Sequence, residues 1–99
     1  MEMNNLKVIS EGIRPILMQY DVKFAGIFGS YARGDEKPSS DVDILVDFNK
    51  PISFVEFFNM KESISDKLEK EVDIVSAKSI LPYFEDYINK DLKIIYGER

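Results

Sequence analysis

The 99-residue sequence contains no cysteine and no histidine. Without cysteine, the chain has no disulfide framework and no thiolate metal site. Without histidine, it lacks imidazole as a metal ligand and the side chain that most often acts as a general base near neutral pH. Any metal ion bound here is therefore expected to be a hard cation held by oxygen atoms.

The sequence also lacks long hydrophobic runs and an excess of positive charge. No apolar run is long enough to span a bilayer, and the polar start MEMNNLKVIS is not typical of a signal peptide. We therefore expect a cytoplasmic protein with no membrane partner. The formal net charge of −5 argues against direct binding of nucleic acid, because phosphate backbones are bound mainly by lysine and arginine. A single nucleotide needs only a local site, so the charge does not exclude one.

The spacing of apolar residues indicates the order of helices and strands. Helical periodicity predicts helices over residues 4–20, about 53–69, and 80–90. Nearly continuous apolar runs predict strands over residues 22–29, 41–48 and 71–77. The last residues, 92–97, are expected to form a short strand or an extended tail. This order predicts a single α/β domain.

Two local features refine the predicted helices. Pro15, with Gly12 nearby, predicts a kink or a break around residues 11–15, because proline removes a backbone hydrogen bond and clashes with the preceding turn. Ser53 and Glu56 form an S-x-x-E pattern, which is typical of a capping box at the start of a helix.

Two aspartates stand at the start of the predicted 41–48 strand. Alternate residues of a strand face the same side, so Asp41 and Asp43 are predicted to point together. Paired carboxylates repel each other unless a cation lies between them, and Mg²⁺ prefers carboxylate oxygens together with substrate phosphates. The alternative is that both are solvated charges at the entrance of a strand, which is the commoner role of an isolated D-x-D.

A similar pattern recurs thirty residues later. The segment EVDIV, residues 71–75, repeats the acid, valine, aspartate, isoleucine order of residues 41–44. If the two strands are neighbours, Asp73 faces the same site as the other two aspartates. Three carboxylates converging from two strands would suit a two-metal site. Taken by itself, Asp73 is equally well explained as a charge at a strand edge.

The dipeptide Gly29-Ser30 ends the first predicted strand and begins SYARG, a predicted single helical turn closed by Gly34. Free N–H groups at a helix start attract anions, and a glycine lets phosphate oxygens approach the backbone. A plain turn is the alternative and the usual role of such a pair. Arg33 also has two interpretations: it contacts a phosphate, or it pairs with Asp35 or another acidic residue of the loop.

The spacing of these features is more specific than any of them alone. Ten residues, 31–40, separate Gly29-Ser30 from the D-x-D pair. This G-S-x10-D-x-D pattern resembles the nucleotidyltransferase superfamily that includes DNA polymerase beta. The surrounding FGSYARGDEKPSSDVDILVDF is similar to the minimal nucleotidyltransferases, or MNT domains, which are antitoxins encoded beside HEPN-domain toxins. The resemblance implies one nucleotidyltransferase domain over residues 1–99, with a small mixed sheet flanked by helices.

The resemblance also implies an activity. Such enzymes bind a nucleoside triphosphate with Mg²⁺; an acceptor hydroxyl attacks the α-phosphorus, and pyrophosphate leaves. The glycine and serine, with the arginine as a further candidate, would hold phosphates, and the three aspartates would bind metal. The last aspartate could also receive the acceptor proton. The candidate site residues are Gly29, Ser30, Arg33, Asp41, Asp43 and Asp73.

For this chain the resemblance implies an antitoxin that transfers AMP from ATP to a hydroxyl, expected to be a tyrosine's, of a HEPN ribonuclease toxin. Two alternatives remain: an antitoxin that acts by binding alone with a vestigial site, and a transferase for a small molecule or tRNA. With 99 residues, we expect no separate acceptor-binding domain, which favours a partner that brings its own hydroxyl. Six apolar residues are expected to be mainly core, with some at a partner interface: Phe54, Val55, Phe58, Tyr83, Phe84 and Tyr87.

Overall fold

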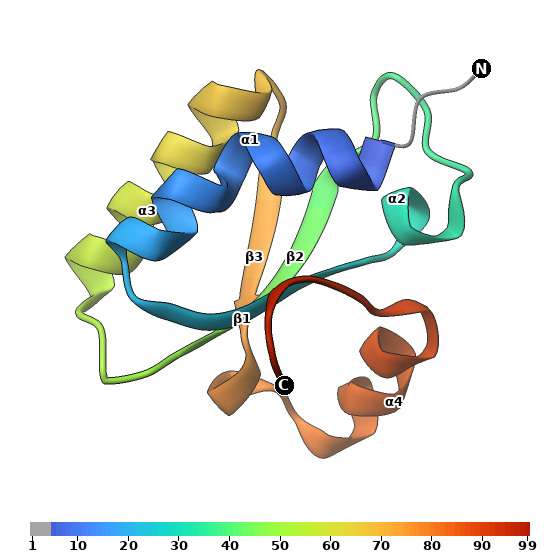
Figure 1. Cartoon of the computed structure of the whole chain (residues 1–99). Coiled ribbons are helices and arrows are strands. Elements are labelled where there is room, and N and C mark those ends of the chain that lie inside the picture. The colour runs from blue at the N-terminus through green and yellow to red at the C-terminus, as the bar shows by residue number, and fades with distance from the viewer. Residues whose placement is uncertain (1–4) are drawn as a thin grey trace.

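A computed structural model describes residues 5–99 and shows a four-stranded sheet with helices on both of its faces (Figure 1). Along the chain the elements are α1 (Asn5–Gln19), β1 (Val22–Phe28), α2 (Ser30–Arg33), β2 (Val42–Phe48), α3 (Phe54–Leu68), β3 (Val72–Ser76), the 3-10 turn η1 (Ala77–Ser79), α4 (Pro82–Asp91) and β4 (Lys93–Gly97). The predicted α/β class is confirmed, and residues 93–97 form a strand rather than a tail.

The sheet has the strand order β3-β2-β1-β4 and mixed direction. β1 runs antiparallel to both β2 and β4, whereas β2 and β3 run parallel to each other. The parallel pair is linked through α3, as a crossover between parallel strands requires. β2 and β3 therefore begin at the same end of the sheet, and this places the two acidic strand starts side by side.

The two faces of the sheet have separate cores. Along β2, Val42, Ile44 and Val46 point to one face and pack against α1 and α3. Leu45 points to the other face, where Ile88 of α4 covers it. Figure 1 shows α1 and α3 together on one side of the sheet and α4 apart from them. The second face is the one that the odd-numbered residues of β2 share.

Helix α1 is not broken at Pro15. It continues through this proline to Gln19, so of the two predicted outcomes the break is wrong, and the kink stays a prediction. Ile13 and Leu17 on either side are fully buried, whereas Pro15 is exposed, so the burial of the helix face outweighs the lost hydrogen bond. Residue 4, where the helix was predicted to begin, lies outside the described residues.

Helix α3 begins with the predicted capping box. The backbone N–H of Glu56 donates to the Ser53 hydroxyl at 3.1 Å, and the Ser53 N–H donates to the Glu56 carboxylate at 3.1 Å. Both bonds satisfy N–H groups that the helix start leaves free. Between residues 5 and 99, no helix is long and apolar enough to cross a membrane.

The six apolar residues that were expected to be mainly core are all exposed or mostly exposed in the structure. The most exposed are Phe54 at 83% and Tyr83 at 80%. The expectation is wrong because the buried faces of these helices are narrow: α3 buries Met60 and Ile64, and α4 buries Ile88. The six residues lie outside these buried faces and are exposed to solvent.

Candidate active site

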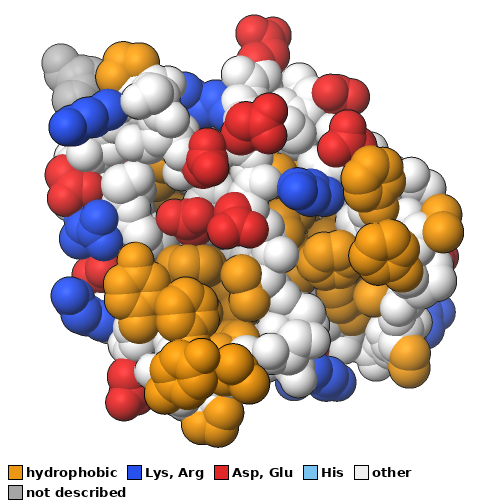
Figure 2. Space-filling view, turned by 180° about the vertical axis from the view of Figure 1, so that it is seen from behind, with side chains coloured by type: hydrophobic (Ala, Val, Ile, Leu, Met, Phe, Trp, Pro, Cys, Tyr) orange, Lys and Arg blue, Asp and Glu red, His pale blue; other side chains and the backbone are white. Residues whose placement is uncertain are grey.

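Three aspartates meet at the start of the parallel strand pair, on the second face of the sheet. Asp43 and Asp73 are register partners on β2 and β3, so their side chains leave the same face of neighbouring strands. Asp43 is partly buried, whereas Asp73 and Asp41 are exposed. Asp41 lies just before β2. Figure 2 shows acidic side chains grouped in the upper part of this face.

The charges of Asp41 and Asp73 both act on the partly buried carboxyl group of Asp43. Burial raises the pKa of Asp43 above its ordinary value, the charges of Asp73 and Asp41 raise it further, and the nearby charge of Arg33 lowers it. The site therefore carries negative charge that the protein compensates only in part. A bound cation would reverse this penalty.

Whether these residues fit a metal ion depends on the donor atoms that they offer and on how those atoms are arranged. Among residues 5–99, no three or more His, Cys, Asp or Glu side chains are arranged so as to hold a metal ion. The aspartates are thus brought to one place without forming a finished cage. Mg²⁺ needs no such cage, since proteins usually hold it through one or two carboxylates together with substrate phosphates. The carboxylate oxygens of Asp43 and Asp73 fit a cation that is shared with a triphosphate.

The Gly29-Ser30 turn lies directly against these carboxylates. Gly29 has φ 76° and ψ −150°, a conformation that strains any residue with a side chain. A β-carbon at this position would overlap the Oδ2 atom of Asp43. The Gly29 carbonyl accepts hydrogen bonds of 3.1 Å from the N–H groups of Ala32 and Arg33, which confirms the predicted helical turn. Glycine is therefore required here both by its backbone angles and by the closeness of Asp43.

Buried side chains and loop contacts fix the position of this turn. Tyr31 and Ala32 of α2 are buried in the first core, so packing is the role of Tyr31. In the following loop, the Lys37 N–H donates to the Ser40 hydroxyl at 2.9 Å, and the Lys70 ammonium donates to the Pro38 carbonyl at 3.0 Å. The first bond closes a turn within the ten-residue spacer, and the second holds the spacer against the segment that leads into β3.

Arg33 forms ion pairs in this structure, as one of its two interpretations predicted. Its Nε atom donates to Asp35 at 3.1 Å, and its guanidinium also donates to Asp91 of α4 at 3.2 Å. Both hydrogen bonds raise the pKa of Arg33, and the bond to Asp35 contributes the most. Sequence reasoning missed Asp91, because it lies 58 positions away and belongs to no local motif. Phosphate contact by Arg33 stays a prediction.

Comparison with known proteins identifies the family. Residues 11–99 match the family described as Polymerase beta, Nucleotidyltransferase. The chain belongs to this nucleotidyltransferase family. A Methanocaldococcus jannaschii protein, by name a protein adenylyltransferase, is 43% identical to this nucleotidyltransferase over 84 residues, which cover 85% of this chain and 90% of the relative. The resemblance stated from the G-S-x10-D-x-D spacing is confirmed at the level of the family and its enzymatic class.

Solved structures show the same fold. A toxin–antitoxin complex with AMP-PNP contains a chain that superposes on this nucleotidyltransferase with a TM-score of 0.80 and 21% identity, covering 91% of this chain and 74% of that one. A complex of an MNT antitoxin with the tri-AMPylated HEPN toxin of Shewanella oneidensis gives a TM-score of 0.74 and 18% identity, covering 97% of this chain and 74% of that one. The predicted minimal nucleotidyltransferase fold is confirmed.

Proposed function

We propose that this nucleotidyltransferase is an antitoxin that transfers AMP from ATP, with Mg²⁺, to a tyrosine hydroxyl of a HEPN-domain toxin encoded beside it. The observation that carries the proposal is the contact of the Gly29 turn with Asp43, whose register partner is Asp73. A phosphate-binding turn and two carboxylates on one sheet face are what transfer of a nucleotide requires. The names of the relatives, a protein adenylyltransferase and MNT partners of HEPN toxins, support the choice of acceptor.

Each part of the site has a role in this reaction. Asp43 and Asp73, with Asp41 beside them, would hold the Mg²⁺, which supplies positive charge to the triphosphate when it is bound. The Gly29-Ser30 turn would hold the β- and γ-phosphates through its backbone and the serine hydroxyl. The acceptor oxygen then bonds to the α-phosphorus while the bond to the bridging oxygen breaks, and pyrophosphate leaves. Catalysis by such a site rests on positioning and charge compensation.

Asp73 is the residue that would accept the proton of the acceptor hydroxyl. It is exposed, so a hydroxyl carried by another protein can reach it from solvent. The chain has no histidine to act in its place.

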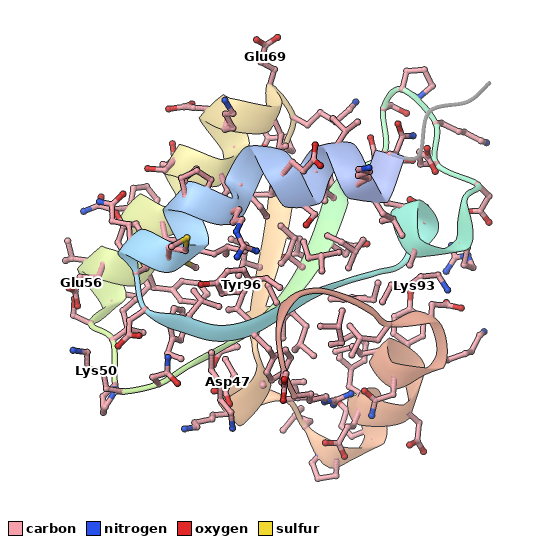
Figure 3. The ribbon with its side chains drawn as sticks, in the orientation of Figure 1. Asp47, Lys50, Glu56, Glu69, Lys93 and Tyr96 are labelled. Atoms are coloured by element: carbon pink, nitrogen blue, oxygen red, sulfur yellow. The ribbon has the colours of Figure 1, made fainter. Side chains whose placement is uncertain are left out.

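The test is a reaction of this protein, ATP and Mg²⁺ with the purified HEPN-domain protein, followed by intact mass spectrometry. We expect an AMP-sized mass gain on the HEPN protein, which Asp41→Asn and Asp43→Asn abolish. Asp47→Asn is the matched control, because Asp47 shares the sheet face of Asp43 but pairs with Lys78 at 3.9 Å. Figure 3 shows Asp47 at the lower end of the sheet, far from Glu69, which precedes β3 at the top.

The same variants separate the proposal from its two alternatives. An antitoxin that acts by contact alone would still protect cells from the toxin when Asp43→Asn is present. A transferase for a small molecule or tRNA would release pyrophosphate from ATP with its acceptor and without any HEPN protein. No mass gain on the HEPN protein with any nucleotide and divalent metal would refute the proposed transfer.

A further inference from the structure

Helix α4 presents a row of exposed hydrophobic side chains. Tyr83 is 80% exposed, Leu81 56%, Tyr87 51% and Phe84 41%, whereas Ile88 is fully buried beneath them. The rings of Phe84 and Tyr87 stack with their centres 5.2 Å apart. Figure 2 shows a group of hydrophobic side chains low on the left, over α4. A contiguous exposed apolar surface often marks a site of interaction with another protein, whereas single exposed apolar residues do not.

This row of side chains leads into the active site. Phe84, Tyr87 and Asp91 are spaced three and four positions apart, so they lie on one face of the helix. Asp91 accepts the 3.2 Å hydrogen bond from Arg33, and the charge of Arg33 acts on Asp43. A protein that covers the aromatic part of α4 therefore also borders the carboxylates of the site.

The charges around the row indicate what kind of protein fits. The exposed Glu85 and Asp86 outnumber the one exposed lysine of α4, Lys90, and the nearby site adds three aspartates. The chain as a whole has a formal net charge of −5. Two copies of this chain joined through α4 would place acidic side chains against acidic side chains, which opposes association. A different protein with lysine or arginine around an apolar patch is complementary to this surface.

We infer that the side chains Leu81, Tyr83, Phe84 and Tyr87, here named the α4 surface, dock the protein that receives the nucleotide. The occupant is a second, different chain with an apolar patch bordered by basic residues and with its acceptor hydroxyl beside that patch. The choice of the HEPN protein as this chain rests on the proposed function. The location of the docking surface is an independent claim about binding.

A second exposed apolar group provides a matched control. Phe54 and Phe58 at the start of α3 are 83% and 50% exposed. Phe54 lines a hollow with Ser76 and Ser79. Ser76 ends β3 three residues after Asp73, about 10 Å along the strand. This group therefore offers similar apolar exposure at the end of β3 that lies away from the carboxylates.

The experiment measures binding of the HEPN-domain protein by calorimetry, in an Asp43→Asn background so that no nucleotide is transferred. We expect Phe84→Ser with Tyr87→Ser to weaken binding about 30-fold or more, as loss of central aromatic contacts does. Phe54→Ser with Phe58→Ser should change the affinity less than about threefold. Added salt should weaken binding to the unaltered α4 surface, because the partner is basic.

A replacement variant and four results that overturn the inference complete the design. If the Phe84→Ser, Tyr87→Ser variant loses its folded circular dichroism spectrum, Tyr83→Ser replaces it, since this side chain is 80% exposed and its loss leaves the core intact. The inference is overturned if the α4 variants bind normally, if the α3 variants lose as much affinity, or if the protein without these variants does not bind. A homodimer of this chain that the α4 variants dissociate overturns it as well.

The docking surface and the proposed transfer fail separately. If the α4 variants bind the HEPN protein normally and still transfer AMP to it, the transfer is supported and this surface is excluded. If the α4 variants abolish binding, but this protein without substitutions adds no AMP to the HEPN protein, the surface is supported and the transfer is excluded.

Discussion

The backbone of Gly29 lies against the carboxylate of Asp43, so closely that a β-carbon at position 29 would overlap the Asp43 Oδ2 atom. Gly29 directly follows β1, and Asp43 lies on the adjacent β2, opposite Phe28, the last residue of β1. The contact joins the turn expected to hold phosphate to a carboxylate expected to hold metal. Strand pairing thus holds at a fixed separation the two groups that the proposed function assigns to one triphosphate.

Gly29→Ala is expected to abolish nucleotide transfer and to destabilise the fold. The added methyl group would push against Asp43 and would occupy a strained backbone at φ 76°, with a cost of about 1–3 kcal/mol. Gly34→Ala is the control: position 34 has φ 83° but nothing lies within 4 Å of its added β-carbon. Urea unfolding and AMP transfer are measured for both. Equal activity losses in the two variants would show that the Asp43 contact is irrelevant.

Asp43→Asn is expected to stabilise the protein at neutral pH in the absence of nucleotide and metal. Burial and the charges of Asp73 and Asp41 raise the pKa of Asp43 in the folded state. Its charged form is therefore disfavoured there, and stability falls as the pH rises through this raised pKa. Asparagine removes that loss, so the melting temperature should rise at neutral pH, while activity falls about 100-fold or more.

The pH dependence provides the check on this prediction. The difference in melting temperature between the two proteins should shrink near pH 4, where an ordinary aspartate itself becomes protonated. Mg²⁺ with ATP should reverse the order, because only the unaltered protein gains from binding them. A melting temperature of Asp43→Asn that stays below that of the unaltered protein at every pH would contradict the assigned origin of the pKa shift.

Arg33→Gln is expected to move the acidic limb of the pH–rate profile to higher pH. The charge of Arg33 lowers the pKa of Asp43, so its removal raises that pKa further. Asp43 would then hold its proton over a wider pH range and could not bind a cation there. Arg33→Lys keeps the charge and should leave the limb in place. A limb that does not move in Arg33→Gln would show that Asp43 does not govern it.

Pro15→Ala is expected to stabilise the fold by about 1–2 kcal/mol, because α1 runs through this exposed proline and alanine restores the missing hydrogen bond. Leu17→Ala, at a fully buried neighbouring position, should destabilise it by about 2–5 kcal/mol. Denaturant unfolding of both variants gives the comparison. Destabilisation by Pro15→Ala would mean that the proline is needed for the geometry of α1.

The sequence alone determined the local part of the site. Strand alternation predicted that Asp41 and Asp43 lie close together, and the charge of Asp41 does act on Asp43 in the structure. The G-S-x10-D-x-D spacing led to the correct family. These signals are readable because they depend on residues close together in the chain. The roles of the six candidate residues, and the single domain over residues 1–99, stay predictions.

Tertiary structure decided what local periodicity cannot report. The parallel, in-register pairing of β2 and β3 brings Asp73 beside Asp43, and the link from Arg33 to Asp91 spans 58 positions. Packing of α1 against the first face of the sheet keeps the helix continuous at Pro15. The aromatic residues of α4 are exposed because this helix buries Ile88 alone against the sheet. A helical pattern marks which residues are apolar, but the surface packed against the helix determines how many of them are covered.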